Sequence, residues 1–207
     1  NEIKTTEVIY IDSNDSLNNL TGVQNFESLK SLYCRQTNLT NLDVSHNTKL
    51  IYLACSETGL TNLDLSQNTE LKTVDCSKTK ITSLDLSKNT EIRNIYCFKT
   101  NITSLDLSKS KKLWYINCSN TGITSLDVSQ NTNLWALNCS HTGITSLDIS
   151  KNLNLWRIDC SSTGLTSLDI SNNINLGKLS DIKCIDTGIV VSDLYKVMRW
   201  PISVNED

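Results

Sequence analysis

Cysteine is the residue type in this sequence with the widest choice of chemistry, and the 207-residue chain contains eight of them. Thiols can pair as disulfides, bind zinc or act as nucleophiles, and their spacing helps to decide among these roles. Seven follow one another at intervals of 21 residues, and the eighth, Cys184, comes 24 residues after the last of them. The seven are Cys34, Cys55, Cys76, Cys97, Cys118, Cys139 and Cys160. Such a strict interval indicates a repeated structural unit.

The interval also argues against disulfides and zinc. Equivalent residues in adjacent parallel strands lie about 4.8 Å apart, with parallel Cα–Cβ bonds. A disulfide needs converging Cβ atoms about 3.8 Å apart, and a single file of thiols cannot surround a zinc ion tetrahedrally. We therefore predict that the cysteines are buried, reduced and stacked as a ladder. Cys184, which lies outside the register, is the one candidate for other chemistry.

Aspartate forms a second column with the same interval, and its carboxylates could serve as calcium ligands. Alternatively, each Asp accepts hydrogen bonds from turn amides, since a serine follows two residues later, as with Asp43 and Ser45. The sequence favours the turn, because known calcium-binding repeats carry Gly-Gly-x-Gly-x-Asp and this chain does not. The column comprises Asp43, Asp64, Asp85, Asp106, Asp127, Asp148 and Asp169.

Uncharged polar residues form further columns. Asn near the end of each unit and Thr three residues after each Cys are expected to bond backbone groups of the stacked coils. A second Thr column, from Thr40 to Thr166, could suit ice binding, but its neighbours Asn38, Gly59 and Lys80 are too mixed for a flat Thr array. The Asn column comprises Asn47, Asn68, Asn89, Asn131, Asn152 and Asn173.

The sequence contains no recognisable catalytic set. The two histidines, His46 and His141, belong to different columns and would lie roughly 20 Å apart from strand spacing alone. There is no glycine-rich phosphate loop and no His/Cys cluster with metal-ligand spacing. We therefore predict a protein that is not an enzyme and has no metal or other cofactor.

The elements that position these columns follow from the repeat. Seven units run without insertion from 29–49 to 155–175. In each unit the apolar fourth residue and the sixth, the Cys, alternate with polar neighbours, which is the period of a strand with one buried face. No helical run of ten or more residues occurs, so the return path should be extended or a short 3₁₀ turn. A 21-residue unit cannot bury its own apolar face, so stacking on both neighbours must close the core.

The pattern L-x-x-L-x-C-x-x-T-x-I/L-x-x-L-x-L resembles the leucine-rich repeat, with Cys in place of the usual Leu and Thr in place of the usual Asn. A 21-residue repeat with stacked cysteines is similar to the internalins, bacterial surface proteins. The resemblance implies a right-handed solenoid with a parallel β-sheet on its concave face, an extended or 3₁₀ convex side and little α-helix. It also implies protein binding by the concave face and a secreted or bacterial cell-surface location, but it does not identify a partner.

Both ends depart from the repeat. Residues 1–28 should form an N-terminal capping coil with a strand at Val8–Ile11, and 29–175 the seven repeats. Residues 176–207 should form an irregular last repeat and a C-terminal cap, with extra residues near Ser180–Ile182 and a short helix from Ser192. The chain begins at Asn1 without an initiator Met, so we expect either a removed signal peptide or a piece of a longer protein.

The residues left free by the scaffold are those that face solvent on the concave sheet. The three tryptophans at the second position of successive units could be a packing ladder or, with nearby aromatic and basic residues, an exposed binding patch. We predict that this face binds a protein partner. The expected ligand-binding residues are Tyr33, Tyr52, Arg93, Tyr96, Phe98, Trp114, Tyr115, Trp135, Trp156 and Arg157.

Composition excludes some partners. The formal net charge is −3, which argues against a nucleic-acid binder, since that would need a concentrated basic face. No apolar run approaches the roughly 20 residues of a membrane-spanning helix. The leading hypothesis is a non-enzymatic recognition module of a bacterial adhesin or virulence type. The alternatives are a carbohydrate-binding module, in which the aromatic face stacks on a glycan, and a structural spacer.

Overall fold

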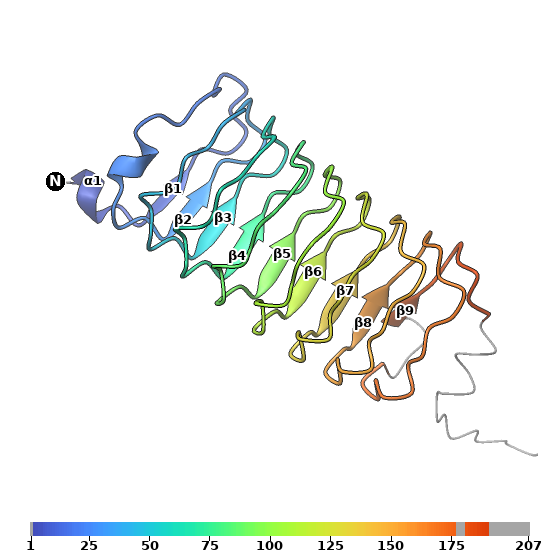
Figure 1. Ribbon diagram of the computed structural model, residues 1–207. Coiled ribbons are helices and arrows are strands. Elements are labelled where there is room, and N and C mark those ends of the chain that lie inside the picture. The colour runs from blue at the N-terminus through green and yellow to red at the C-terminus, as the bar shows by residue number, and fades with distance from the viewer. Residues whose placement is uncertain (1, 177–180, 191–207) are drawn as a thin grey trace, which may run out of the picture.

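Each 21-residue unit forms one coil of a solenoid, and the strands of successive coils pair side by side (Figure 1). The computed structural model describes residues 2–176 and 181–190. Outside the sheet these residues include a short helix, α1 (Glu2–Thr5), and a 3₁₀ helix, η1 (Val23–Asn25). The described strands, in order along one parallel sheet, are β1 (Val8–Tyr10), β2 (Ser31–Tyr33), β3 (Tyr52–Ala54), β4 (Thr73–Asp75), β5 (Asn94–Tyr96), β6 (Tyr115–Asn117), β7 (Ala136–Asn138), β8 (Arg157–Asp159) and β9 (Ile182–Lys183).

The strand register confirms the repeat predicted from the sequence. The strands of the seven units occupy the third to fifth residues, and equivalent residues pair without a slip, as Leu32 does with Leu53. At the C-terminal end Ile158 pairs with Ile182, so the extra residues are absorbed before β9 and Cys184 returns to the cysteine column. The helix predicted from Ser192 lies outside the described residues, and the division at residues 28/29 and 175/176 stays a prediction.

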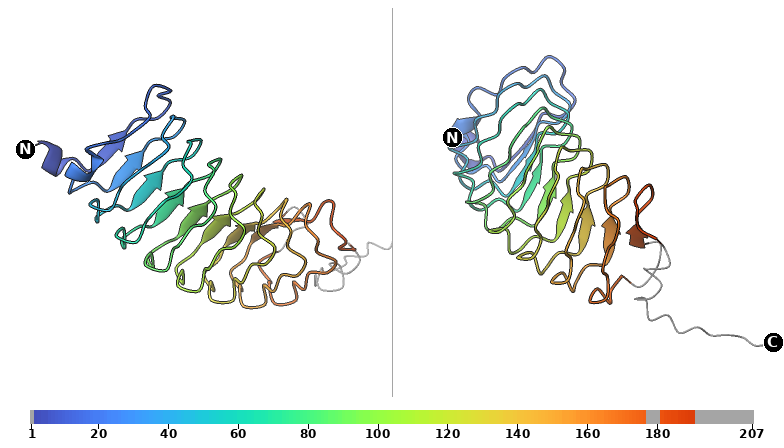
Figure 2. Two further views of the ribbon diagram at one scale, coloured as in Figure 1. Left: turned by 45° about the horizontal axis from the view of Figure 1, so that its top comes forward. Right: turned by 45° about the vertical axis from the view of Figure 1, so that its right-hand side comes forward.

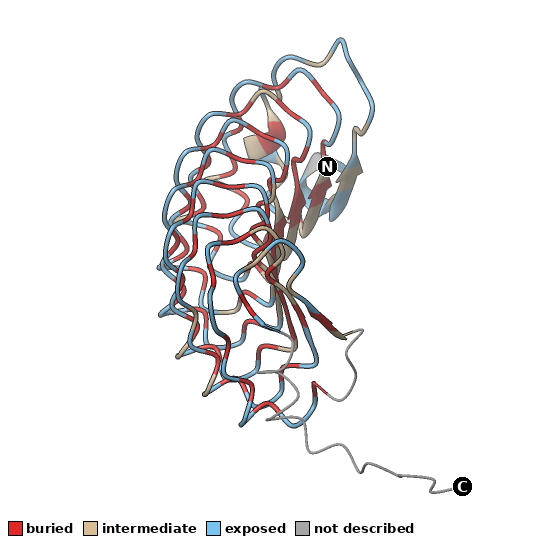
Figure 3. Cartoon of the chain, turned by 90° about the vertical axis from the view of Figure 1, so that its right-hand side faces the viewer, coloured by how far each residue is buried: buried red, intermediate tan, exposed pale blue. Residues whose placement is uncertain are grey.

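The solenoid is bowed, with the strands on the inner side and the turns on the outer side (Figures 2 and 3). The outer path of each coil is irregular and contains tight i→i+3 turns, such as the one in which the Asn68 amide donates to Leu65 O. This arrangement confirms a leucine-rich-repeat solenoid with a parallel sheet on the concave face and little α-helix.

The core is a set of stacked columns that run the length of the sheet. The fourth residue of each unit is fully buried or nearly so, and so is the Cys two residues later. All eight cysteines are unpaired; seven are buried and Cys184 is half-buried, which confirms the cysteine ladder. Burial raises the pKa of the Cys76 and Cys118 thiols to about 12, because an anionic thiolate is poorly solvated in this core.

The Asn column is the polar counterpart of the cysteine ladder. Each Asn side chain is buried, and its Nδ2 donates two hydrogen bonds to carbonyls of the preceding coil, as Asn68 does to Val44 O at 3.0 Å and Asn47 O at 2.9 Å. The inward Thr residues act within their own coil: Thr79 Oγ1 donates to Cys76 O at 2.7 Å. Both columns therefore bond backbone carbonyls as predicted: the Thr bonds the Cys carbonyl of its own coil, and the Asn adds a second hydrogen bond to carbonyls that already accept one from a turn amide.

Ser110 interrupts the Asn column. It is buried, and among the described residues its hydroxyl has no hydrogen-bond partner. An Asn at this position would reach Leu86 O and Asn89 O, by analogy with Asn89, which donates to Leu65 O and Asn68 O one coil earlier.

We expect Ser110→Asn to raise the free energy of unfolding by about 1 kcal/mol, because two new buried hydrogen bonds form while one buried polar atom without a partner, the Ser hydroxyl, is exchanged for another, the Asn Oδ1. Urea denaturation followed by circular dichroism measures the change. The matched variant Asn89→Ser should destabilise by at least as much. A Ser110→Asn protein less stable than the wild type would contradict the assignment of this position to the column.

Candidate binding face

The structure decides between the two interpretations of the Asp column. In all seven coils the Asp Oδ1 accepts a hydrogen bond from the backbone amide of the Ser two residues later, at 2.8–3.0 Å. These hydrogen bonds hold the pKa of Asp64 below its ordinary value. Across residues 2–176 and 181–190, no three His, Cys, Asp or Glu side chains are grouped so that they could hold a metal ion. The carboxylates thus act as turn acceptors.

The ten expected binding residues all lie on the inner sheet or at its margin. Six come from the third, fifth and seventh positions of the units, which lie in the strands β2–β8 or two residues after them. The other four, the three tryptophans and Arg93, are the second residues of their units and stand immediately before the strands. Arg93 and Arg157 are exposed, whereas the tyrosines and Phe98 are half-buried against neighbouring side chains. Ring contacts gather the tyrosines and the tryptophans into three clusters, which do not include Arg93, Phe98 or Arg157.

The first cluster contains three tyrosines. The Tyr10 and Tyr33 rings are stacked with centroids 4.4 Å apart, and Tyr33 and Tyr52 are stacked at 4.8 Å. The sequence predicts Tyr10 in the capping strand but does not mark it as a binding residue. Its alternation with Ile9 in that strand was the available signal, since it places Tyr10 on the same face as Tyr33. The Tyr10 side chain is 70% exposed, so this cluster offers an accessible aromatic surface.

An ion pair holds the edge of this first cluster. Arg35 Nε and Nη2 donate to Asp12 Oδ2 at 3.0 and 2.6 Å, and the Arg35 amide donates to Asp12 Oδ1 at 2.7 Å. Partial burial opposes ionisation of Asp12, but the hydrogen bonds from Arg35 prevail and hold its pKa below the ordinary value. The guanidinium also lies 5.8 Å from the Tyr33 ring centroid, close enough for a cation–π contact. Both charged groups are therefore fixed in place before any partner arrives.

The second cluster lies at the middle of the sheet. Tyr96 and Tyr115 contact each other with ring centroids 5.1 Å apart. Beside them, Asp75 accepts hydrogen bonds from Ser77 Oγ at 2.6 Å and Ser56 Oγ at 2.9 Å. Burial is the main reason that the pKa of Tyr96 lies above its ordinary value, and the Asp75 carboxylate adds to the effect. The hydroxyl of Tyr96 is protonated near neutral pH, as in an ordinary tyrosine, and can donate to a ligand.

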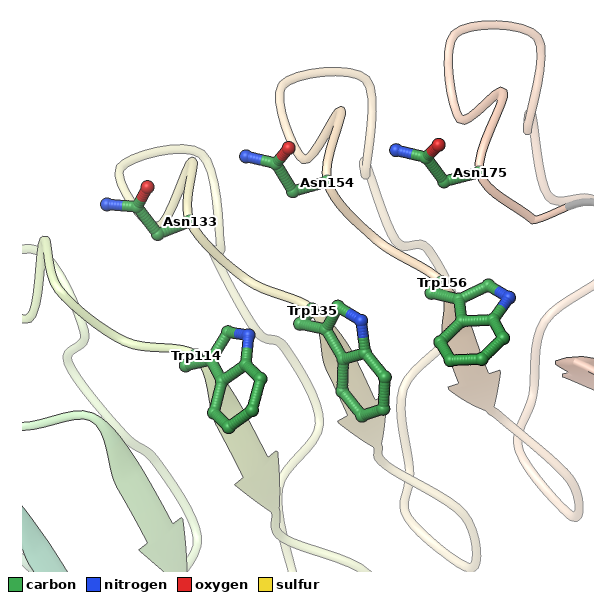
Figure 4. A pocket seen from close by; sticks show the side chains of 6 residues that line it. All are labelled: Trp114, Asn133, Trp135, Asn154, Trp156 and Asn175. Atoms are coloured by element: carbon green, nitrogen blue, oxygen red, sulfur yellow. The ribbon is translucent and has the colours of Figure 1, made fainter.

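The third cluster is the Trp row, Trp114, Trp135 and Trp156, at the strand margin (Figure 4). The ring centroids of neighbours are 5.3 and 5.2 Å apart, so the rings pack on one another. Trp114 and Trp156 are nevertheless 50% and 48% exposed. The two interpretations offered by the sequence, a packing ladder and an exposed patch, are therefore both features of the same rings.

A row of asparagines accompanies the tryptophans. Asn133, Asn154 and Asn175 line an open groove of about 540 Å³ together with the Trp row (Figure 4). Sequence reasoning missed this Asn row, although the motif Asn-Leu-Trp stands twice in the sequence, at 133–135 and 154–156. In each motif the Asn and the Trp stand on either side of a buried leucine, so both of their side chains lie on the outside of the coil.

These features define the class of the protein: a leucine-rich-repeat solenoid whose core carries a cysteine ladder. The sequence matches no protein family and no curated protein. Among solved structures it is similar to the functional domain of InlJ from Listeria monocytogenes, which includes a cysteine ladder. The identity is 27% over 89% of this chain and 54% of that one, with a TM-score of 0.55.

Two further structures share the fold at lower identity. An internalin, InlF, from Listeria monocytogenes is 17% identical over 95% of this chain and 59% of that one, with a TM-score of 0.85. The leucine-rich-repeat protein LIC12759 from Leptospira interrogans is 18% identical over 94% and 58%, with a TM-score of 0.82. The chain thus spans a little over half the length of all three structures. The internalin-type resemblance inferred from the sequence is confirmed.

Proposed function

We propose that this solenoid is a non-enzymatic recognition module that binds a protein partner through its concave sheet. The observation that carries the proposal is the contrast between two sets of positions in the repeat. The inward positions hold nearly the same residue in every coil, whereas the third, fifth and seventh positions change from coil to coil. Packing requires the first set to be constant, and the second set is free to match a partner.

The composition of the variable positions supports a protein ligand. The first two clusters combine tyrosines with Arg35 and hydrogen-bonded carboxylates, and Tyr and Arg are enriched in the residues that dominate binding energy at protein interfaces. The ring stacking and the Arg35–Asp12 pair fix these side chains, so little conformational entropy is lost on binding. No nucleic acid is expected as a partner.

The proposal also includes the location of the protein. We infer from the resemblance to internalins that the protein is secreted or displayed on a bacterial surface, where it acts as an adhesin. No helix within residues 2–176 and 181–190 is both long enough and apolar enough to cross a membrane. Detection of the chain by antibody on intact cells or in culture medium tests the location.

A protein array tests the binding itself. We expect Tyr33→Ser combined with Tyr96→Ser to weaken binding of the labelled domain to its specific ligand at least ~10-fold, because one aromatic anchor is removed from each of the first two clusters. The control Lys88→Ala with Lys109→Ala changes exposed residues of the outer turns and should bind like the wild type. The proposal fails if no array protein distinguishes the tyrosine variant from this control.

A further inference from the structure

Two surface columns change chemistry together along the solenoid. The second position of the units holds Lys30, Ile51, Lys72 and Arg93, and then tryptophan in the next three coils. The last position holds charged residues up to Lys112 and then asparagine in the next three coils. These charged residues are Lys49, Glu70, Glu91 and Lys112. Both positions lie on the surface, so packing of the core does not require this switch.

The switch produces a groove without charge. In the coils before the switch the last position is charged, and Lys112 forms an ion pair at 2.5 Å with Glu91 of the preceding coil. Further along, the groove is lined only by the Trp row and the Asn row. A cationic or anionic ligand would find no complementary charge among these six lining residues, whereas a neutral polar ligand can be desolvated there at low cost.

Hydrogen bonds fix the orientation of the Asn row. Asn133, Asn154 and Asn175 each donate through Nδ2 to a carbonyl of the preceding coil, at 3.1, 3.1 and 3.0 Å. Within the described residues their Oδ1 atoms accept no hydrogen bond, and the indole N–H groups of the Trp row donate none. The groove therefore has fixed asparagine amides along one side and indole rings with free N–H donors along the other (Figure 4).

We propose that this groove binds a neutral polysaccharide whose chain runs along the solenoid axis. A sugar ring has C–H faces that pack on indole and hydroxyl groups that both donate and accept, which matches the two rows. Successive coils present the same Trp and Asn, so a ligand that repeats its own unit can make the same contacts at each coil. A folded protein has no such repeat and would gain little from three equivalent coils. The site is separate from the tyrosine clusters proposed for the protein partner.

Native affinity electrophoresis in gels containing mixed-linkage β-glucan, xylan, mannan or dextran tests the proposal. We expect at least one of these polymers to retard the wild-type chain. Trp135→Ala, which removes the central ring, should raise the dissociation constant at least ~10-fold. Trp135→Phe keeps an aromatic ring and should retain part of the retardation, which separates loss of stacking from loss of folding. Soluble oligosaccharides of the bound polymer should bind more tightly as they lengthen and then level off once three coils are covered.

Two controls make the result specific. Tyr52→Ala alters the first cluster, and Leu153→Ser alters an exposed side chain next to the Asn row but outside the groove. Both should be retarded like the wild type. The proposal is overturned if none of the four polymers retards the wild type, or if Trp135→Ala is retarded equally. Loss of the array ligand in Trp135→Ala without any polysaccharide effect would assign the groove to the protein partner instead. If Trp135→Ala loses polysaccharide binding but still binds the array ligand, the groove and the tyrosine clusters are separate sites.

Discussion

Raising the pH from 9 to 10 is expected to unfold the protein in a steep transition. The ladder thiols keep their protons in the folded chain, because burial raises the pKa of Cys34, Cys76, Cys118 and Cys160 to about 12. Burial shifts the pKa of the other three in the same direction. Well below pH 9, the ordinary pKa of a thiol, both states are protonated and stability is unaffected. Above it only the unfolded chain loses thiol protons, which costs the folded state about 1.4 kcal/mol per thiol per pH unit.

For seven thiols the loss of folding free energy is about 10 kcal/mol at pH 10, which is as large as the whole stability of a typical domain. Circular dichroism during an alkaline titration under reducing conditions measures the transition. Cys97→Ala with Cys118→Ala should make it shallower, since two of seven titrating groups are gone. In the native state at pH 8, half-buried Cys184 should react with iodoacetamide far faster than Cys76, whose thiolate population is about 1000-fold below that of a free thiol. A transition that the double variant leaves unchanged would refute this account.

Replacing Asn152 with alanine is expected to lower the free energy of unfolding by about 2–3 kcal/mol. Its Nδ2 donates to Val128 O at 3.0 Å and Asn131 O at 2.9 Å, and the side chain is fully buried. Its removal leaves both carbonyls with one hydrogen bond fewer and a small cavity between two coils. The loss is kept moderate because the Asn152 Oδ1 atom is itself buried without a partner in the described structure, so the alanine variant also relieves a cost.

Asn154, two residues later, provides the matched control. It is exposed and donates a single hydrogen bond, to Thr132 O at 3.1 Å. Asn154→Ala should therefore cost less than ~1 kcal/mol by the same denaturation measurement. Equal losses in the two variants would show that burial of the Asn column is not what makes it stabilising.

The core was predictable because its residues serve only packing and recur at a fixed interval. Leu32, Leu53 and Cys55 could be placed in the interior from the alternation within one unit and the stacking of the next. It was harder to predict which polar residues reach the surface and which residues they lie next to there. Nothing in the type of Asn133 separates it from Asn131, yet one faces a groove and the other the core. The two side chains differ in environment only because the backbone of the coil turns between them and directs one inward and the other outward.

The backbone itself held one feature that residue types could not reveal. Eight coils, from the one with Gln36 to the one with Asp186, pass through a left-handed residue two positions after the Cys, with φ of 53–57°. None of these residues is glycine, the residue that this conformation favours. The coil path therefore imposes the conformation on whatever side chain stands there, and local preference gives no signal of it.

Among the described strands, each pairs with the strands next to it in sequence order, and this has a mechanical consequence. If the two ends of the solenoid were pulled apart, the load would pass through one coil interface after another, and a terminal coil would detach before the interior ones. Each detached coil of 21 residues would release roughly 65 Å of slack chain. The molecule would lengthen in equal steps under tension and shorten again as the coils re-form.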